Sequence, residues 1–383
     1  MNILTSLKTR YSHWLEIDLS ALADNYKIIK NSVKPGTEIL AIVKANAYGH
    51  GVKEVLNIAC EEGISYFGVA TMEEAIEIRE AFPNVNAVNI LVLDVNFTSD
   101  AECIYEYDLK PVVFTYDMIN ALNDEGKRLG KKAKIHLKID TGMGRIGVWK
   151  EDVIDFIENI LSMENIEIEG ICSHYAASES NLPFTLVQWE AFSKVVEHFR
   201  RKGISFKYNH IANSAGTFLT GLPYFNMVRI GIMGYGLMPR LNMRNELGLK
   251  PVMAWRSRVI YCKKVEAGRS IGYGCTYVTP VDTKIATIPI GYADGYMRSL
   301  SNKGIVLIKG KRCPIAGRVA MDHIMVDVGL DPDVKVGDEV TLIGTQGAEK
   351  LSCEELGDLA GTIPYELACN SGRRAHRIYF YSK

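Results

Sequence analysis

Short apolar segments alternate with amphipathic segments along the first two thirds of the chain. The segments between the apolar runs have helical periodicity, as at Val52, Val55 and Leu56, which share one helix face. Successive strand starts are separated by roughly 27 residues, which is the size of a βα unit. The eight apolar runs of strand length are 39–43, 66–69, 89–92, 112–114, 134–139, 168–172, 206–209 and 227–230.

Eight successive βα units predict a (β/α)8 barrel of the TIM type. An open doubly wound sheet has the same alternation, so the periodicity alone leaves both architectures open. Polar residues just after the predicted strands favour the barrel, because barrel enzymes place their chemistry at the carboxyl ends of the strands. These residues are Lys44, Arg145, His174, Asn213, Ser214 and Arg229.

The pattern changes after about residue 249, where short β-rich runs follow one another with Gly and Pro turns between them. This texture predicts a second, mainly antiparallel β domain over 249–383, after a barrel domain over 12–248. Residues 1–11 could associate with the β domain, and the run 14–19 could pair with either domain.

Composition and charge exclude several classes of protein and of binding partner. The chain has 383 residues, of which 47% are apolar and 23% charged, which disfavours disorder and fibrous repeats. A net charge of -1 gives no general attraction to nucleic acid or to an anionic membrane. Residues 1–11 lack the apolar core of a secretory signal, and the uncharged stretch 211–228 is too polar to span a membrane. We therefore expect a cytoplasmic protein.

The eight cysteines are scattered, with no Cys-x-x-Cys and no paired Cys/His spacing. Neither a zinc site nor a disulfide framework is indicated, and no metal is expected.

Lys44 follows an apolar strand and precedes the segment Ala-Asn-Ala-Tyr-Gly-His-Gly. A lysine in such a place is commonly a solvated charge. In a barrel, however, Lys44 would point into the mouth, where partial desolvation lowers the pKa of the amine and frees it for Schiff-base chemistry. Lys44 is therefore a candidate cofactor anchor.

The segment 140–147 contains Gly-x-Gly-x-x-Gly after a strand, a spacing found in dinucleotide-binding loops. Here Arg145 and Ile146 occupy the last variable positions, and no acidic residue ends the next strand, which runs to His174. A dinucleotide site is therefore disfavoured, and Arg145 is better interpreted as a positioned cation. His174 is equally compatible with a structural role.

Arg229 lies inside an apolar run and needs hydrogen-bond acceptors, because the free-energy cost of burying an unpaired guanidinium is prohibitive. The segment 210–214 places a hydroxyl after the seventh strand, and Gly231 follows the eighth. In barrels, the loops after strands seven and eight commonly bind phosphate.

These segments, in this order, resemble those of the alanine racemases, a family of pyridoxal phosphate enzymes built from a barrel and a β domain. The resemblance spans nearly the whole chain. The matching segments are 41–51, 138–147, 174, 210–214, 229–231, 272–274, 291–296, 317–318, 321–322 and 365–366.

The resemblance implies that Lys44 forms a Schiff base with pyridoxal 5'-phosphate and that Arg229 donates to the pyridine nitrogen. His174 would hydrogen-bond Arg229. An arginine at that nitrogen keeps it unprotonated, so the ring is a weaker electron sink and transamination has little time to occur. The groups that would hold the phosphate are Tyr48, Ser214, Tyr365 and the backbone amides of Gly231 and Ile232.

The same resemblance implies that Arg145 and the backbone of Met321 bind the substrate carboxylate. Lys138, which carries a carbamate in some relatives, and Asp322 would support the site.

Racemising an α-amino acid requires removal of the Cα proton on one face and return of a proton on the opposite face. The resemblance assigns these roles to Lys44 and Tyr273. A tyrosine is a poor base at neutral pH, and Arg229 and Arg145 would favour its phenolate. In the family, Tyr273 and Met321 face the cofactor of the other subunit, which implies a homodimer.

The expected function is therefore interconversion of L- and D-alanine, supplying D-alanine for peptidoglycan. A broad-specificity or serine racemase of the same fold is an alternative, because departures from the family pattern at Ala320 and Pro364 adjoin Met321 and Tyr365. A non-catalytic pyridoxal phosphate-binding barrel is another, although such a protein needs no second base.

Overall fold

The computed structural model describes residues 11–81, 88–94, 97–331 and 333–382. The chain divides into two compact units. Tyr26–Ala47 and Val52–Gly234 form the barrel unit, and the other described residues, among them Tyr48–Gly51, form the β unit. The predicted association of residues 1–11 lies outside the described residues except for Tyr11, whose ring stacks on that of His376 in the β unit at 4.4 Å.

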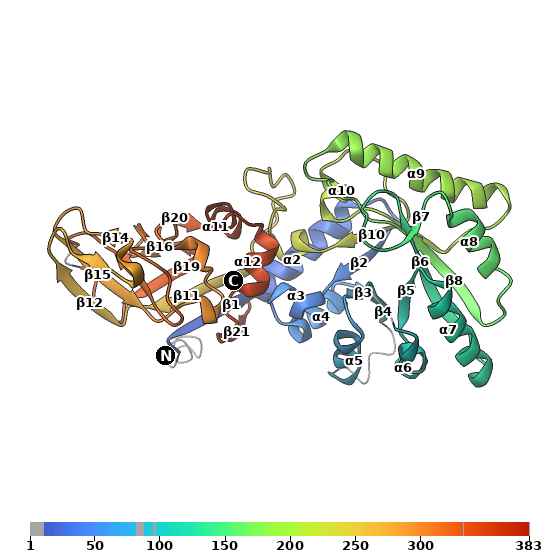
Figure 1. Cartoon of the computed structure of the whole chain (residues 1–383), viewed down its shortest axis with the longest axis horizontal. Coiled ribbons are helices and arrows are strands. Elements are labelled where there is room, and N and C mark those ends of the chain that lie inside the picture. Colours follow the sequence, from blue (N-terminus) through green and yellow to red (C-terminus); the bar gives the residue numbers. More distant parts are fainter. Residues whose placement is uncertain (1–10, 82–87, 95–96, 332, 383) are drawn as a thin grey trace. The chain divides into compact units, whose positions relative to one another are not determined.

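The barrel unit is a ring of parallel strands (Figure 1). The backbone N–H of Arg229 in the strand β10 donates to the carbonyl of Ala212, just beyond β9, at 3.0 Å, so the ring is nearly closed. A short strand β7 (Val148–Trp149) pairs with β6. The predicted (β/α)8 barrel is confirmed. In spatial order its strands are β10 (Met227–Ile230), β2 (Glu38–Ile42), β3 (Tyr66–Val69), β4 (Asn89–Val92), β5 (Lys110–Val113), β6 (Ala133–Asp140), β8 (Ile166–Cys172) and β9 (Tyr208–His210).

Helices alternate with these strands and lie outside the ring (Figure 1). Local signals set their ends: Thr115 accepts from the backbone N–H of Met118 at the start of α7, and Gly130 ends that helix with a φ of 63°. None of the described helices is both long enough and apolar enough to cross a membrane. The helices along this part of the chain are α2 (Leu19–Ser32), α3 (Lys44–Tyr48), α4 (Val52–Glu61), α5 (Met72–Ala81), α6 (Ala101–Glu106), α7 (Tyr116–Leu129), α8 (Val153–Ile160), α9 (Leu182–Arg201) and α10 (Ser214–Phe218), with a 3₁₀ turn at Thr98–Asp100.

The β unit is mainly antiparallel, as predicted. Its largest sheet includes β1 (His13–Asp18), which pairs antiparallel with β11 and parallel with β21, so the run 14–19 belongs to this sheet. The strands of the large sheet, in order, are β17 (Lys311–Pro314), β16 (Ile305–Ile308), β19 (Glu339–Gln346), β11 (Met253–Arg258), β1 and β21 (His376–Phe380), with β20 (Glu349–Leu351) paired to β19.

Smaller elements complete the β unit. The remaining elements are a sheet of β12 (Tyr261–Val265), β15 (Thr283–Ile288) and β18 (Ile324–Asp327), a pair of β13 (Ser270–Ile271) and β14 (Tyr277–Val278), the helices α11 (Cys353–Ala360) and α12 (Pro364–Asn370), and 3₁₀ turns at Tyr273–Cys275, Tyr292–Asp294 and Arg298–Leu300. A further 3₁₀ turn, Ile232–Tyr235, follows β10 where the chain passes from the barrel unit to the β unit.

Gly236 is a position where the β unit has no room for a side chain. Its φ is +73°, and a Cβ there would lie 1.8 Å from the carbonyl oxygen of Lys250. We expect Gly236→Ala to lower the free energy of unfolding by about 2–4 kcal/mol, because backbone strain and overpacking act together. Gly268→Ala is the matched control: its φ is +81° with no atom within 4 Å, so only the strain, about 1 kcal/mol, remains. Urea unfolding measures both variants, and equal losses would contradict the packing argument.

Candidate active site

Lys44 begins a left-handed turn at the carboxyl end of β2. Ala45, Asn46 and Ala47, which form most of α3, have φ values of 52–53°. The left-handed conformation costs roughly 1–2 kcal/mol for each residue other than glycine. Such strain persists only where the surrounding structure holds it, and it is concentrated at functional sites. The turn therefore marks Lys44, which is half-buried, as a functional position.

Glu74, in the first turn of α5, holds this turn in place. Its Oε1 accepts the backbone N–H of Ala45 at 2.6 Å, and its Oε2 accepts that of Ala70 at 2.8 Å. Asn46 contributes from within the turn, because its Oδ1 accepts the N–H of Val52 at 2.8 Å. One carboxylate thus fixes the direction in which the chain leaves Lys44.

Arg229 on β10 is buried and hydrogen-bonded through both terminal nitrogens. Nη1 donates to Nδ1 of His210 at 2.7 Å, and Nη2 donates to Nδ1 of His174 at 3.0 Å. The carbonyl oxygens of Ser173 and Ile211 also accept from Nη2, at 2.7 and 2.8 Å. None of the described residues accepts a hydrogen bond from Nε, so the Nε–H is available to a bound molecule.

The charge state of these groups follows from burial. Burial lowers the pKa of Arg229 to about 10, which leaves the guanidinium charged at neutral pH. Burial and then the charge of Arg229 lower the pKa of His174 well below its ordinary value, and the same two causes act on His210. Both histidines are therefore neutral, and each accepts from Arg229 through Nδ1 with its hydrogen on Nε2.

Three cations gather around this position without an equal number of carboxylates. Burial first, and then the charges of Arg229 and Arg145, lower the pKa of Lys138 on β6 to about 8. The carboxylate of Asp140 is engaged by backbone amides of its own loop, at 2.8 Å from those of Gly142 and Met143. Such a site favours an anionic ligand, so a group that carries phosphate or carboxylate fits it.

The segment after β9 provides further polar groups. Ser214 begins α10, is buried, and accepts the backbone N–H of Gly231 through its Oγ at 3.0 Å. Gly231 and Ile232 directly follow β10, and Ile232 begins a 3₁₀ turn. The hydroxyl and these amides therefore lie at the carboxyl end of the strands, where barrels bind phosphate.

Several predicted residues lie in the β unit instead. Tyr48 is buried against Tyr235 and Tyr365, with ring centroids 5.2 and 6.1 Å apart. Gly49 makes this packing possible, because a Cβ there would lie 2.6 Å from the carbonyl oxygen of Ala368 in α12.

Tyr273 and Met321 are exposed to solvent, as are Arg145 and Asp322. The side chain of Tyr273 is 72% exposed and that of Met321 is 53% exposed. Two glycines shape their loops: a Cβ on Gly274 would lie 3.0 Å from Nη1 of Arg318, and one on Gly291 would lie 2.1 Å from the carbonyl oxygen of Met321.

Asp322 anchors the loop that carries Met321. Nη2 of Arg374 donates to Asp322 at 2.8 Å, and Nε of the same arginine donates to buried Asp294 at 2.8 Å. Asp294 in turn accepts the backbone N–H of Gly291 at 2.9 Å.

Comparison with known proteins places this geometry in a family. The sequence matches the alanine racemase N-terminal domain over residues 17–239 and the alanine racemase C-terminal domain over residues 252–379. The chain belongs to the alanine racemase family.

Individual alanine racemases match over nearly their whole length. The alanine racemase of Halothermothrix orenii is 43% identical over 367 residues, which cover 96% of each chain. The crystal structure of alanine racemase from E. faecalis superposes with a TM-score of 0.89 at 36% identity, covering 97% of this chain and 99% of that one. A Bartonella henselae alanine racemase with covalently bound pyridoxal phosphate has a TM-score of 0.87 at 32% identity, covering 97% and 100%.

The barrel unit of this alanine racemase family member brings five of the predicted residues into electrostatic reach of one another. After burial, the charges that lower the pKa of His174 are those of Arg229, Lys138, Arg145 and Lys44. Tyr48, Tyr365, Tyr273, Met321 and Asp322 belong to the β unit. Motif reasoning missed Glu74, because its contact with Ala45 joins residues 29 positions apart in the sequence.

Glu74→Ala tests whether this carboxylate holds the Lys44 turn. We expect the free energy of unfolding to fall by about 1–3 kcal/mol and amide hydrogen exchange at Ala45 and Ala70 to accelerate, because both amides lose their acceptor. Glu73→Ala is the control, since the adjacent exposed glutamate makes no recorded bond to the turn. Unchanged exchange at Ala45 would show that Glu74 is dispensable there.

Proposed function

We propose that this protein is a pyridoxal phosphate-dependent alanine racemase, with Lys44 and Tyr273 as the two bases that act on opposite faces of the alanine Cα. As a member of its family it interconverts L- and D-alanine and supplies D-alanine for peptidoglycan. The observation that carries the cofactor assignment is Arg229, whose other donors are taken by the protein while its Nε–H remains for the pyridine nitrogen.

The residues around Arg229 fit the rest of the cofactor. When bound, pyridoxal phosphate delocalises the electron pair that proton removal leaves on Cα. Lys44 would hold the cofactor aldehyde covalently. The groups proposed to bind the phosphate are Tyr48, Ser214, Tyr365 and the backbone amides of Gly231 and Ile232.

Two protein groups would transfer the Cα proton, one on each face of the substrate. The amine of Lys44 takes or returns the Cα proton on one face, and the phenol of Tyr273 does so on the other. Arg145 and the backbone of Met321 receive the substrate carboxylate, while Lys138 and Asp322 support them. A donor that cannot be deprotonated at the ring nitrogen keeps that nitrogen neutral, which favours rapid return of the proton over side reactions.

We further propose a homodimer in which Tyr273 and Met321 of each subunit serve the site of the other subunit. The exposure of Tyr273 and Met321 supports this arrangement, because residues with catalytic and substrate-binding roles are otherwise left in solvent. We also propose that the enzyme acts in the cytoplasm. Along the sequence we keep the proposed domain division at 12–248 and 249–383, with β1 of the first segment joining the large sheet of the second.

Tyr273→Ala tests the second base. We expect racemisation of either enantiomer to fall at least about 100-fold, the lower range for loss of a general base, while the covalent link between Lys44 and the cofactor is kept. Visible absorption before and after borohydride treatment reports the link, and Cα proton exchange in deuterated water reports the chemistry. Tyr261→Ala, at another exposed tyrosine of the β unit, is the control. Wild-type turnover in Tyr273→Ala would end the two-base assignment.

Comparison of amino acids tests substrate choice. We expect kcat/KM for alanine to exceed that for serine and for lysine by at least about tenfold, because a pocket shaped for one methyl group loses affinity for larger side chains. Equal values would favour a broad-specificity or serine racemase. Cofactor binding with no exchange of the Cα proton of any of the three would favour a non-catalytic binder.

A further inference from the structure

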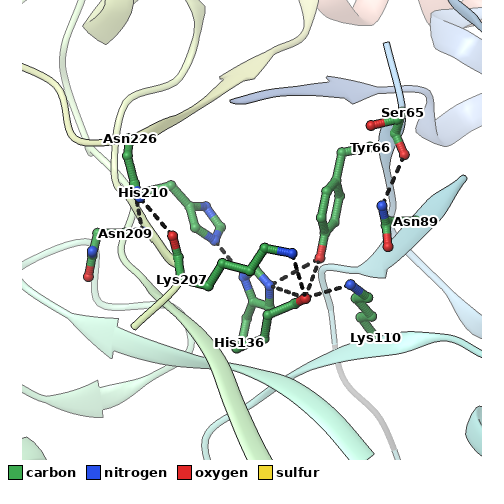
Figure 2. A network of polar contacts seen from close by, with 10 residues as sticks. Ser65, Tyr66, Asn89, Lys110, His136, Lys207, Asn209, His210 and Asn226 are labelled. Atoms are coloured by element: carbon green, nitrogen blue, oxygen red, sulfur yellow. Dashed lines mark hydrogen bonds and ion pairs between the residues drawn. The ribbon is translucent and has the colours of Figure 1, made fainter. Parts of the chain in front are cut away.

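A continuous line of buried polar side chains runs from His210 through His136 to Tyr66 in the interior of the barrel (Figure 2). Nδ1 of His210 accepts from Arg229, and Nε2 of His210 lies 2.8 Å from Nδ1 of His136. Nε2 of His136 lies 3.2 Å from the hydroxyl of Tyr66 and 3.5 Å from Oε2 of Glu169. The line therefore begins at the predicted cofactor contact and ends at a carboxylate.

The donor at one end of this line and the acceptor at the other favour the same direction for every hydrogen bond along it. A guanidinium can only donate, so Nδ1 of His210 accepts and its Nε2 carries the hydrogen. Nδ1 of His136 must then accept, which places the hydrogen of His136 on Nε2, facing Tyr66 and Glu169. The Tyr66 hydroxyl accepts from His136 and donates onward to Oε2 of Glu169 at 2.8 Å.

Glu169 is well suited to be the terminal acceptor. Nζ of Lys110 donates to its Oε2 at 2.6 Å, and Lys207, which is mostly exposed, lies 3.6 Å from its Oε1. Burial raises the pKa of the carboxyl group, but hydrogen bonds from His136 and Lys110 outweigh burial and hold it well below its usual value. Burial lowers the pKa of His136, so this histidine is neutral beside a charged carboxylate.

Burying these polar side chains in a barrel core costs free energy. Tyr66, His136 and His210 are fully buried, and Glu169 is only 2% exposed, in a place that barrels normally fill with branched apolar side chains. Gly170 makes room for it, since a Cβ there would lie 2.7 Å from both Cε1 and Nδ1 of His136. A fully satisfied network of this kind fixes geometry rather than adding stability.

We propose that Glu169 is a positioning residue for Arg229, acting through Tyr66, His136 and His210. It holds both histidines as neutral Nε2–H tautomers, so that His210 accepts from Nη1 and Nε–H stays available for the cofactor ring nitrogen. The effect on turnover rests on the proposed function, whereas the tautomers do not.

The tautomers are tested directly in the wild-type holoenzyme. Nitrogen-15 NMR of histidine-labelled protein, with His136→Gln and His210→Gln used to assign the signals, should show a protonated Nε2 and an unprotonated Nδ1 in both residues. A protonated Nδ1 on either histidine would overturn the proposal even if the protein is an active racemase.

Two variants test the role of the carboxylate. Glu169→Gln removes its charge, and Tyr66→Phe removes the bridging hydroxyl while keeping the ring. In both we expect the His136 signals to shift toward a mixture of tautomers, kcat to fall about tenfold with little change in KM, and more pyruvate to be released per racemisation as the ring-nitrogen contact loosens.

Asn89→Ala is the matched control, because it removes a hydrogen bond from Nδ2 of Asn89 to the carbonyl of Ser65 in the same part of the barrel (Figure 2). It should leave the tautomers and the pyruvate ratio unchanged. Equal effects in the control and the two variants would reduce Glu169 to a structural role, and unchanged His136 signals in Glu169→Gln would refute the positioning role. If no variant or wild-type protein racemises alanine, the proposed function fails while the NMR result still decides the tautomers.

Discussion

The burial of one guanidinium inside the barrel is the constraint around which the site is organised. A charged group away from water must have its donors matched, and Arg229 matches those of its two terminal nitrogens partly with carbonyls that become available where β8 and β9 end. Two histidines complete the set, and each can accept only while neutral. The need to satisfy Arg229 therefore dictates the charge state of its neighbours and leaves one defined N–H for the cofactor.

A second constraint acts at Lys44, which follows β2, the strand that pairs with β10. The left-handed turn after β2 raises the energy of the chain locally, and Glu74 and Asn46 compensate by accepting amides that the turn leaves unpaired. The two constraints are met in a similar way. Glu74 fixes the Lys44 turn by accepting a backbone N–H, and two histidines fix Arg229 by accepting from its side chain. Because β10 and β2 are adjacent strands, the two devices converge on one end of the barrel.

Much of this fold could be predicted from the sequence, for reasons that individual elements illustrate. The barrel strands are buried on both faces, so runs such as 66–69 and 90–92 are continuously apolar and stand out. Other features could not be predicted. The run 14–19 fits either unit by composition, and only pairing with β11 and β21 decides. Single polar residues inside predicted strands, such as His136 and Glu169, do not reveal their partners, because those partners lie on strands distant in sequence. The catalytic and binding roles of the motif residues remain proposals.

The two proposed bases lie on different units, so the proposed chemistry depends on the proposed homodimer. The cations that would favour a phenolate, Arg229 and Arg145, belong to the barrel unit, whereas Tyr273 is exposed on the β unit. A phenol far from positive charge is a weak base at neutral pH, since its pKa is near ~10. In the proposed homodimer, Arg229 and Arg145 of the other subunit would supply this charge to the site of Tyr273. A chain that binds cofactor alone would hold one competent base, and the second would become one only on association, so that protein concentration itself would set the fraction of active enzyme.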